Sequence, residues 1–261
     1  MDELSPSVDT TRPNVARIYD WMLGGSANFA IDRELGQRML DESGSTPLAP
    51  RLNRSFLRRA VRYLVEQDID QFLDLGSGIP TVGNVHEIAQ TANPDARVGY
   101  VDIEPVAIAH SQQILAGNPN AIAIGADLRD VDTVLAAAGR LLDFSRPVGL
   151  LMVAIIPFLP DADDPTGIID RYLAALPSGS HLAISHVTAD GTDDVARAVA
   201  FFDKTPTPVT IRSHAEVLSL LHGVELVEPG LVWTTLWRPD GGDPELPDPG
   251  RSGIYGAVGR R

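Results

Sequence analysis

Three aspartates in the first half of the chain follow three predicted strands, and their placement could build a ligand site. The first is Asp74, in the run FLDLGSG at residues 72–78, which reads as a buried strand ending in a glycine turn before a helix. Glycines in such a turn let the backbone approach a ligand closely, and the helix that follows offers free N–H groups. A lone G-x-G is a weak signal, because an ordinary strand-to-helix turn can contain it.

The second and third carboxylates strengthen this interpretation. Asp102 ends the next predicted strand, where a carboxylate can accept both hydroxyl hydrogens of a ribose. Asp127 follows the third strand and could accept from an adenine amino group, while Leu128 would cover the ring face. Asp127 could equally be a helix N-cap. Its position relative to Asp74 and Asp102 favours the ligand role, because ligands of open α/β sheets bind at the carboxyl ends of successive strands.

The turn also bears on which adenosine cofactor is bound. A dinucleotide fingerprint would place glycine at position 81, where this chain has Thr81. The carboxylate of Asp74 would repel a pyrophosphate but could pair with the ammonium of a methionine moiety. The residues therefore favour S-adenosylmethionine over a nicotinamide dinucleotide.

The elements that must position these residues fall into two blocks. Residues 1–12 read as a flexible leader, and helices are then expected from Pro13 to the stop at Gly24-Gly25, over about 28–41 and, after a loop at 47–50, over about 53–67. Beyond residue 71, strands alternate with helices, which is typical of a parallel sheet with helical crossovers. Strands are expected at 71–75, 97–102, 121–125, 147–155 and 181–186, and helices near 83–92, 105–116, 131–139, 165–175 and 192–203.

The end of the chain predicts a different connection. Ser213 opens a helix with Glu216 three residues later as a capping box. Two strand-like runs follow, at 230–238 and 253–260. Their proximity requires an antiparallel pair, because a parallel pair needs a helix-length crossover.

Composition narrows the class of protein. The 261 residues include no cysteine, which excludes disulfides and thiolate metal sites, and we expect no metal centre. The formal charge of −14 opposes binding to nucleic acid or to anionic membranes. The acidic, polar N-terminus is unlike a secretory signal, and the apolar stretch from Pro147 to Pro160 is shorter than the roughly 20 residues of a bilayer span. A cytoplasmic protein is expected.

The chain as a whole resembles a known family. From about residue 13 it is similar to an S-adenosylmethionine-dependent methyltransferase family of high-GC Gram-positive bacteria that was formerly a domain of unknown function. The resemblance is carried by the runs RIYDWMLGGSANFAIDRE, RLNRSFLRRAVRYL, QFLDLGSGIPTVGNVHEIAQ, YVDIEPVAIAHS, GADLRD, DFSRPVGLLMVAIIPFLPDADDP and GSHLAISH. It implies a class I methyltransferase (Rossmann-like) α/β fold at 69–261, with a seven-stranded sheet whose last strand is antiparallel, and a helical lid at 13–68.

The resemblance also implies roles for individual residues. The methionine half of the cofactor would be held by Asp74, Gly76, Ser77 and Gly78, the ribose by Asp102, and the adenine by Asp127 and Leu128. Three further residues at strand ends complete the expected binding set: Ile103, Val153 and Ala154. The lid over the cofactor would be formed by Tyr19, Gly24, Gly25, Asn28 and Phe29, helped by Arg54. The chain departs from the family at Pro157, where a histidine is expected.

A proton acceptor is harder to assign. His186, at the end of the fifth strand, is a candidate for catalysis, and His86 a weaker one, although a lone histidine is more often structural. Methyl transfer can proceed by positioning and desolvation alone. Three functions therefore stay open: a methyltransferase acting on a small-molecule acceptor, a non-catalytic S-adenosylmethionine-binding regulator or partner subunit, and an NAD-linked oxidoreductase.

Overall fold

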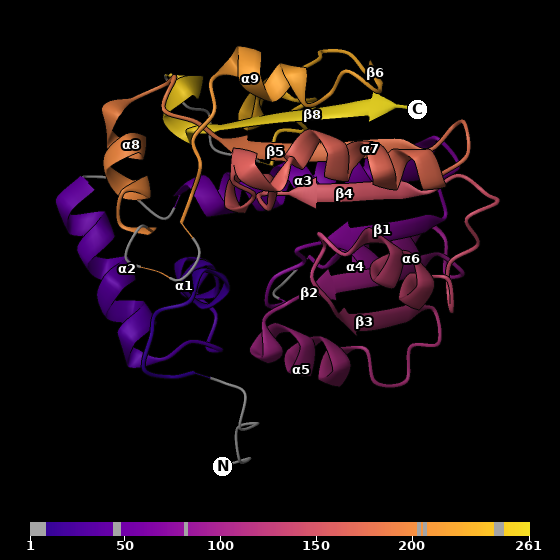
Figure 1. The fold of residues 1–261 in the computed structure, drawn as a ribbon, viewed down its shortest axis with the longest axis horizontal. Helices are drawn as coiled ribbons and strands as arrows, with labels where there is room; N and C mark the ends of the chain where they lie inside the picture. The colour runs from indigo at the N-terminus through magenta and orange to yellow at the C-terminus, as the bar shows by residue number, and fades with distance from the viewer. Residues whose placement is uncertain (1–8, 44–47, 81–82, 203–204, 206–207, 243–247) are drawn as a thin grey trace.

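The parallel core of the sheet matches the predicted strands closely. A computed structural model describes residues 9–43, 48–80, 83–202, 205, 208–242 and 248–261. Five parallel strands lie in the order β3-β2-β1-β4-β5. Their bounds are β1 Gln71–Leu75, β2 Arg97–Asp102, β3 Ala121–Gly125, β4 Gly149–Val153 and β5 His181–Val187. Because all five run the same way, their carboxyl ends share one edge, which lies on the left in Figure 1.

The last strand, β8 (Ile254–Arg260), runs antiparallel to β5 along its whole length. Two short strands, β6 (Glu225–Leu226) and β7 (Val232–Trp233), also pair with β8, so they share its other edge. They behave as one edge strand interrupted at 227–231, where Pro229 has no N–H to give to the ladder. The described sheet thus has eight strands in place of the expected seven, with the topology otherwise as expected.

The interruption corrects the sequence prediction at the edge of the sheet. The predicted run 230–238 is a strand only at 232–233 and then turns into a short 3-10 helix, Thr234–Leu236. The antiparallel pairing expected between this run and the last strand is present in β7 and β8. Pairing through Glu225 and Leu226 was not predicted.

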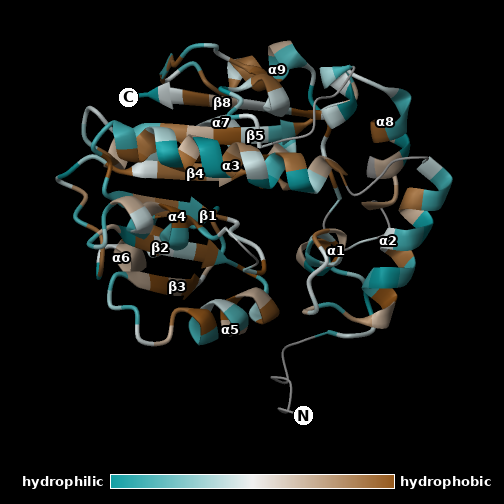
Figure 2. Ribbon diagram, turned by 180° about the vertical axis from the view of Figure 1, so that it is seen from behind, coloured by the Kyte–Doolittle hydropathy of each residue, from teal (hydrophilic) through white to brown (hydrophobic). Residues whose placement is uncertain are grey.

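Helices cover both faces of the sheet, because alternate residues of each strand face opposite sides. Leu73 and Leu75 pack with α6 (Val131–Ala138), α7 (Pro165–Ala175) and α9 (His214–Ser219), whereas Phe72 packs with α3 (Leu48–Glu66) and α4 (Val85–Ala92). Figure 1 views the first face and Figure 2 the second. No helix within the described ranges is long and apolar enough to cross a bilayer.

The N-terminal helices stand at the carboxyl edge of the sheet. Helices α1 (Val15–Met22) and α2 (Ala30–Ser43) pack against the region of α8 (Asp193–Val199) and Phe201. Figures 1 and 2 both show this group beyond the ends of the strands. The buried Arg17 fixes it, because its guanidinium pairs with Asp32 at 2.8 Å and donates to the carbonyl of Arg12.

Helix boundaries differ from the sequence prediction in a few places. Helix α3 begins at Leu48, five residues before the expected start, and Pro50 lies in its first turn, where no backbone N–H partner is needed. Helix α8 ends at Val199. The capping box of Ser213 and Glu216 is present as predicted. Residues 1–8 of the proposed leader, and Thr81, lie outside the described residues.

A buried arginine ties α3 to the C-terminal part of the chain, and its removal gives a test of the fold. Arg59 donates to the carbonyls of Trp237 (2.9 Å) and Thr234 (2.6 Å). We expect Arg59→Leu to lower the free energy of unfolding by about 2–3 kcal/mol, because two buried carbonyls lose charged donors. The exposed Arg62, which pairs with Asp240, supplies the control. Arg62→Leu should cost less than about 1 kcal/mol in the same urea titration, and equal losses would contradict the assignment.

Candidate functional site

The glycine turn after β1 is built for close approach. Gly76 has φ +68°, and a Cβ at this position would come within 2.3 Å of the Ile155 side chain. The backbone N–H groups of Gly76 and Ser77 both donate to the carbonyl of Val101, at 2.8 and 3.1 Å. Gly78 also has φ +68°, and it faces open space. The sequence therefore needs glycine at 76 for packing and favours it at 78 for conformation.

Asp102 lies at the end of β2 directly beside this turn. Its Oδ2 accepts from the N–H of Gly78 at 2.7 Å, and its Oδ1 accepts from the N–H of Glu104 at 2.8 Å. Burial raises the pKa of Asp102, and these hydrogen bonds oppose the rise. The carboxylate is thus held in one orientation, and each oxygen keeps a lone pair for a further donor.

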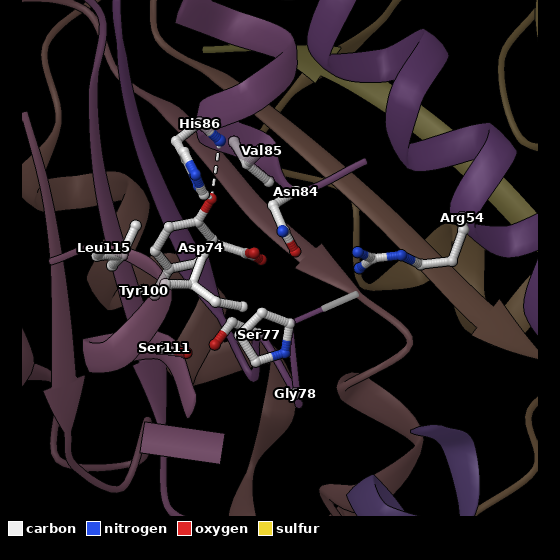
Figure 3. A pocket seen from close by; sticks show the side chains of 12 residues that line it. Arg54, Asp74, Ser77, Gly78, Asn84, Val85, His86, Tyr100, Ser111 and Leu115 are labelled. Carbon is white, nitrogen blue, oxygen red and sulfur yellow. Dashed lines mark hydrogen bonds between the residues drawn. The ribbon is translucent and has the colours of Figure 1, made fainter. Parts of the chain in front are cut away.

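A pocket on the other side of the turn brings Asp74 and Arg54 together. Figure 3 shows the carboxylate of Asp74, from β1, and the guanidinium of Arg54, from α3, both pointing toward Asn84. Burial raises the pKa of Asp74 to about 7; nearby Arg54 opposes the rise and Asp102 adds to it. The Oγ of Ser77, also in this pocket, is buried and has no hydrogen-bond partner among the described residues. A zwitterionic ligand would find a carboxylate, a cation and a hydroxyl here.

Tyr100 and His86 form a hydrogen-bonded pair in the wall of this pocket. The hydroxyl of Tyr100 accepts from the backbone N–H of His86 at 2.8 Å and lies 2.8 Å from Nδ1 of the same residue. Burial lowers the pKa of His86, so its neutral form is favoured. The sequence did not identify Tyr100 as a site residue. In the structure it lies opposite Asp74 in the register of β1 and β2.

A second, open hollow lies beyond the ends of β2 and β3. Its lining includes Ile103, Pro105, Ile108, Gly125 and Ala126, which follow or flank the ends of β2 and β3. Ile103 is 67% exposed, which is unusual for a large apolar side chain. An apolar ring stacked on Ile103 would cover surface that is otherwise in water.

Asp127 and Leu128 lie next to this hollow with other partners. The carboxylate of Asp127 is clasped by Arg129, whose Nε donates at 2.9 Å, and this interaction lowers the pKa of Asp127. The N-cap of α6 is Asp130, so the capping role considered for Asp127 belongs to another residue. Leu128 is 8% exposed and packs in the main core, so Ile103 is better placed to cover a ring.

The residues proposed to form a lid fall into two groups. Some form the turn between α1 and α2, and others contact the rest of the fold. Asp20 accepts from Asn28 Nδ2 at 2.9 Å, and a Cβ on Gly25 would come within 1.9 Å of the Asp20 carboxylate. Gly24 has φ +83° and Asn28 donates to the carbonyl of Gly25, so these three residues form the turn between α1 and α2.

Phe29 and Tyr19 are two of the N-terminal side chains that contact the rest of the fold. Phe29 packs with Ile79 of the glycine turn and with Val106 and Ala107 at the start of α5 (Pro105–Ile114). The hydroxyl of Tyr19 donates to the carbonyl of Pro50 at 3.2 Å, and burial raises the pKa of its phenol. Through Phe29, the segment between α1 and α2 therefore packs on the glycine turn and on α5, the helix that follows Asp102.

The end of β4 lies between the glycine turn and β5. Val153 is the last residue of the strand and is partly buried, and Ala154 follows with φ +59°. The N–H of Ala154 donates to the carbonyl of Ser185 at 3.2 Å. Pro157, at the position where a histidine was expected, lies in a 3-10 turn and accepts from the N–H of Thr210 at 2.8 Å.

His186 is fully enclosed and both of its ring nitrogens are engaged. Arg212 donates to Nε2 at 3.1 Å, so Nδ1 carries the proton and donates to the carbonyl of Val187 at 2.7 Å. Burial lowers the pKa of His186 to about 4, the hydrogen bond to Val187 opposes this, and Arg212 adds to it. This arrangement favours a structural role for His186 over proton transfer.

Comparisons with known proteins agree with the fold and identify the family. The model of the family described as S-adenosyl methyltransferase matches residues 1–261. A DUF574 family protein from Streptomyces avermitilis MA-4680 is 40% identical, with a TM-score of 0.93 over 97% of this chain and 99% of that one. A Thermobifida fusca YX protein provisionally assigned as a methyltransferase is 36% identical, with a TM-score of 0.93 over 100% and 99% of the two chains.

More distant similarity extends to the fold alone. The S-adenosylmethionine-dependent methyltransferase SibL is 16% identical, with a TM-score of 0.51 over 78% of this chain and 54% of that one. The comparison with curated proteins found no match. The resemblance seen in the sequence is confirmed: the chain belongs to the S-adenosyl methyltransferase family and has a class I methyltransferase fold.

Proposed function

We propose that this protein binds S-adenosylmethionine at the carboxyl ends of β1, β2 and β3 and transfers its methyl group to a small-molecule acceptor in the cytoplasm. The observation that carries the proposal is Asp102, held by the N–H groups of Gly78 and Glu104 at 2.7 and 2.8 Å beside a glycine turn. A carboxylate fixed in this way can accept the two hydroxyl hydrogens of a ribose.

The methionine half of the cofactor fits the pocket behind the turn. The Asp74 carboxylate would take the ammonium, and the Arg54 guanidinium the carboxylate, since each is a charge-assisted hydrogen bond. Ser77 Oγ would gain the partner that it lacks within the described structure. The three groups come from β1, the glycine turn and α3, so the pocket recognises both charges of an amino acid.

The adenosine half fits the opposite side of Asp102. The exposed Ile103 and the short side chain of Ala126 would sandwich the adenine, with Asp127 and Leu128 at its edge. Val153 and Ala154, at the end of β4, would border the ribose and the sulfur. Gly24, Gly25, Asn28 and Phe29 would keep the lid above the cofactor, with Tyr19 beneath it.

The bound cofactor would supply an electrophilic methyl group on a sulfonium. The chain's own part is to hold the two reactants in line and to exclude water, and positioning of this kind can supply much of the acceleration in a displacement. Both ring nitrogens of His186 are hydrogen-bonded, so His186 would take no part in proton transfer. The nucleophile would arrive unprotonated or lose its proton to solvent.

The acceptor is proposed to be small on grounds of charge. The formal charge of −14 gives no electrostatic attraction to a phosphate backbone or an anionic membrane. The described residues of two segments, 187–202 with 208–212 and 239–242 with 248–252, would contribute to an acceptor pocket, because substrate specificity in such folds resides in variable loops.

Calorimetric titration with S-adenosylmethionine tests the ribose site. We expect Asp102→Ala to weaken binding by about 30- to 1000-fold, because two hydrogen bonds to a charged acceptor are lost. Asp102→Asn, which keeps one acceptor oxygen, should lose less. The exposed Asp95, in the turn after α4, is a matched control whose replacement by alanine should change nothing. Equal affinity of Asp102→Ala and the wild type would exclude this ribose site, and a preference for NAD would exclude the cofactor.

The raised pKa of Asp74 predicts a pH dependence. In the unliganded protein this carboxyl titrates at about pH 7, and only its ionised form pairs with an ammonium. Affinity should therefore fall as pH is lowered from 7.5 to 5.5, by up to about tenfold per unit, with proton release on binding. Titrations in buffers of different ionisation enthalpy measure this release. Asp74→Asn should bind weakly with a flat pH profile, and a wild-type profile in this variant would contradict the role.

Turnover separates an enzyme from a non-catalytic binding protein. We expect protein incubated with methyl-labelled S-adenosylmethionine and fractionated small metabolites to place label in a low-molecular-weight product and to release S-adenosylhomocysteine. Asp102→Ala should abolish the label. Tight cofactor binding without labelled product in any fraction would favour the alternative, a regulatory or partner protein that holds the cofactor.

A further inference from the structure

A line of buried hydrogen bonds joins α1, the first helix of the proposed lid, to the ends of β5 and β4. The amide of Asn53, on α3, donates to the Tyr19 hydroxyl at 3.0 Å, and its oxygen accepts from Ser185 Oγ at 2.6 Å. Ser185 Oγ in turn accepts from the N–H of Ala154 at 2.9 Å. Asn53 and Ser185 are 1% and 0% exposed, so water cannot replace these bonds without rearrangement.

Donors and acceptors alternate consistently along this line. The N–H of Ala154 can only donate, so the Ser185 hydroxyl accepts from it and gives its own hydrogen to Asn53. Asn53 then presents its NH₂ to Tyr19, whose hydrogen is left for the carbonyl of Pro50, at 3.2 Å. In this arrangement the Ser185 hydroxyl, the Asn53 amide and the Tyr19 hydroxyl each have hydrogen-bond partners, and a connected buried network of this kind rigidifies the groups that it joins.

The far end of the line reaches the cofactor turn. Ala154 adopts φ +59°, a left-handed conformation that is unfavourable for a residue with a Cβ, and the bonds that its N–H donates to Ser185 help to hold it there. The next side chain, Ile155, fills the space above Gly76, where a Cβ would lie 2.3 Å away. A shift of the glycine turn therefore displaces Ile155 and, through Ala154, the line that leads to the lid.

We propose that Asn53 and Ser185 are positioning residues that couple the lid to the turn after β4, so that a cofactor held by the glycine turn also orders α1. This inference rests on the proposed function. The lid and the 154–155 turn flank the carboxyl edge of the sheet, where the methyl group would be transferred. Their coupling makes the acceptor side form only when the cofactor is in place.

The chain offers a matched control for Ser185 in the residue that precedes the same strand, β5. Ser180 is also 0% exposed, and its Oγ accepts from the N–H of Val148 at 3.1 Å, just before β4 begins. Each serine thus bonds a backbone N–H beside β4, one at each end of the sheet. Ser180 lies at the amino end, away from the lid.

Hydrogen exchange with and without saturating S-adenosylhomocysteine tests the coupling. In the wild type the ligand should slow exchange of the amides in Val15–Met22. Ser185→Ala should still bind, with affinity reduced by about fivefold, and should lose about fivefold of that slowing, as expected for one buried hydrogen bond. Ser180→Ala should retain the full effect of the ligand. Thermal unfolding should show similar losses for the two serine variants.

A second variant probes the lid end of the line without touching the core strand. Tyr19→Phe removes only the hydroxyl and should reproduce the effect of Ser185→Ala on ligand-dependent exchange. Because the residues act as one unit, the double variant should lose no more than either single one. Equal slowing of α1 in the wild type and in both variants would overturn the coupling, as would equal loss in Ser180→Ala. A wild type that binds no ligand would instead reject the proposed function, and the coupling with it.

Discussion

The contact between Ile155 and Gly76 is the constraint on which the site depends. Strand order reverses between β1, which continues to β2 and β3, and β4, which lies on its other side. Ligands of open α/β sheets bind at such a switch point, because the connections from neighbouring strands leave in opposite directions. Here the Ile155 side chain, from the turn after β4, packs directly against Gly76 and fits only because residue 76 has no side chain. The glycine turn, the left-handed conformation of Ala154 and the bonds from its N–H to Ser185 all lie next to this contact.

The site concentrates buried charge that the rest of the molecule must accommodate. Asp74 and Asp102 are both buried and both have raised pKa values, chiefly because burial disfavours the charged form. Such groups destabilise a fold unless they are paired or hydrogen-bonded, and strongly perturbed carboxyls in a pocket are typical of ligand sites. Asp102 accepts from two backbone N–H groups, and the charge of Arg54 opposes the rise in the pKa of Asp74. A ligand ammonium would complete the environment of Asp74, and the proposed affinity for a zwitterion would then have a direct electrostatic origin.

The sequence predicted those parts of the fold that depend on local pattern. The glycine turn, the carboxylate at the end of β2, the first helix and the capping box at Ser213 each follow from neighbouring residues, and the structure contains all four. The break in the edge strand could have been inferred from Pro229, but the weak two-residue β6 has no periodicity to detect. The early start of α3 was missed because Pro50 was interpreted as a loop residue, although proline is compatible with a first helical turn.

What the sequence could not predict are contacts between distant segments. Asn53 and Ser185 are 132 positions apart, and nothing in the neighbourhood of either residue indicates the other. The same holds for Arg212, which fixes the neutral form of His186 from 26 residues away. The choice between Leu128 and Ile103 as the side chain that could cover a ring also required the structure. Both are large apolar side chains after a strand, and only their burial distinguishes them.

The position of α1 and α2 bears on how the proposed methyl transfer could proceed without an assigned base. Arg17 and Asp32 are buried together within the lid, and Arg17 also lies 3.6 Å from Glu104, whose own N–H orients Asp102. Asn14, the N-cap of α1, donates to the same Glu104 at 2.6 Å. Helix α1 is therefore anchored at Glu104, beside Asp102, and at Asn53, whose amide also bonds Ser185 near the end of β5. Two anchors on opposite sides of the strand ends fix the lid's orientation, which one anchor could not do. In a displacement that needs alignment and exclusion of water, that orientation is the contribution the protein can make.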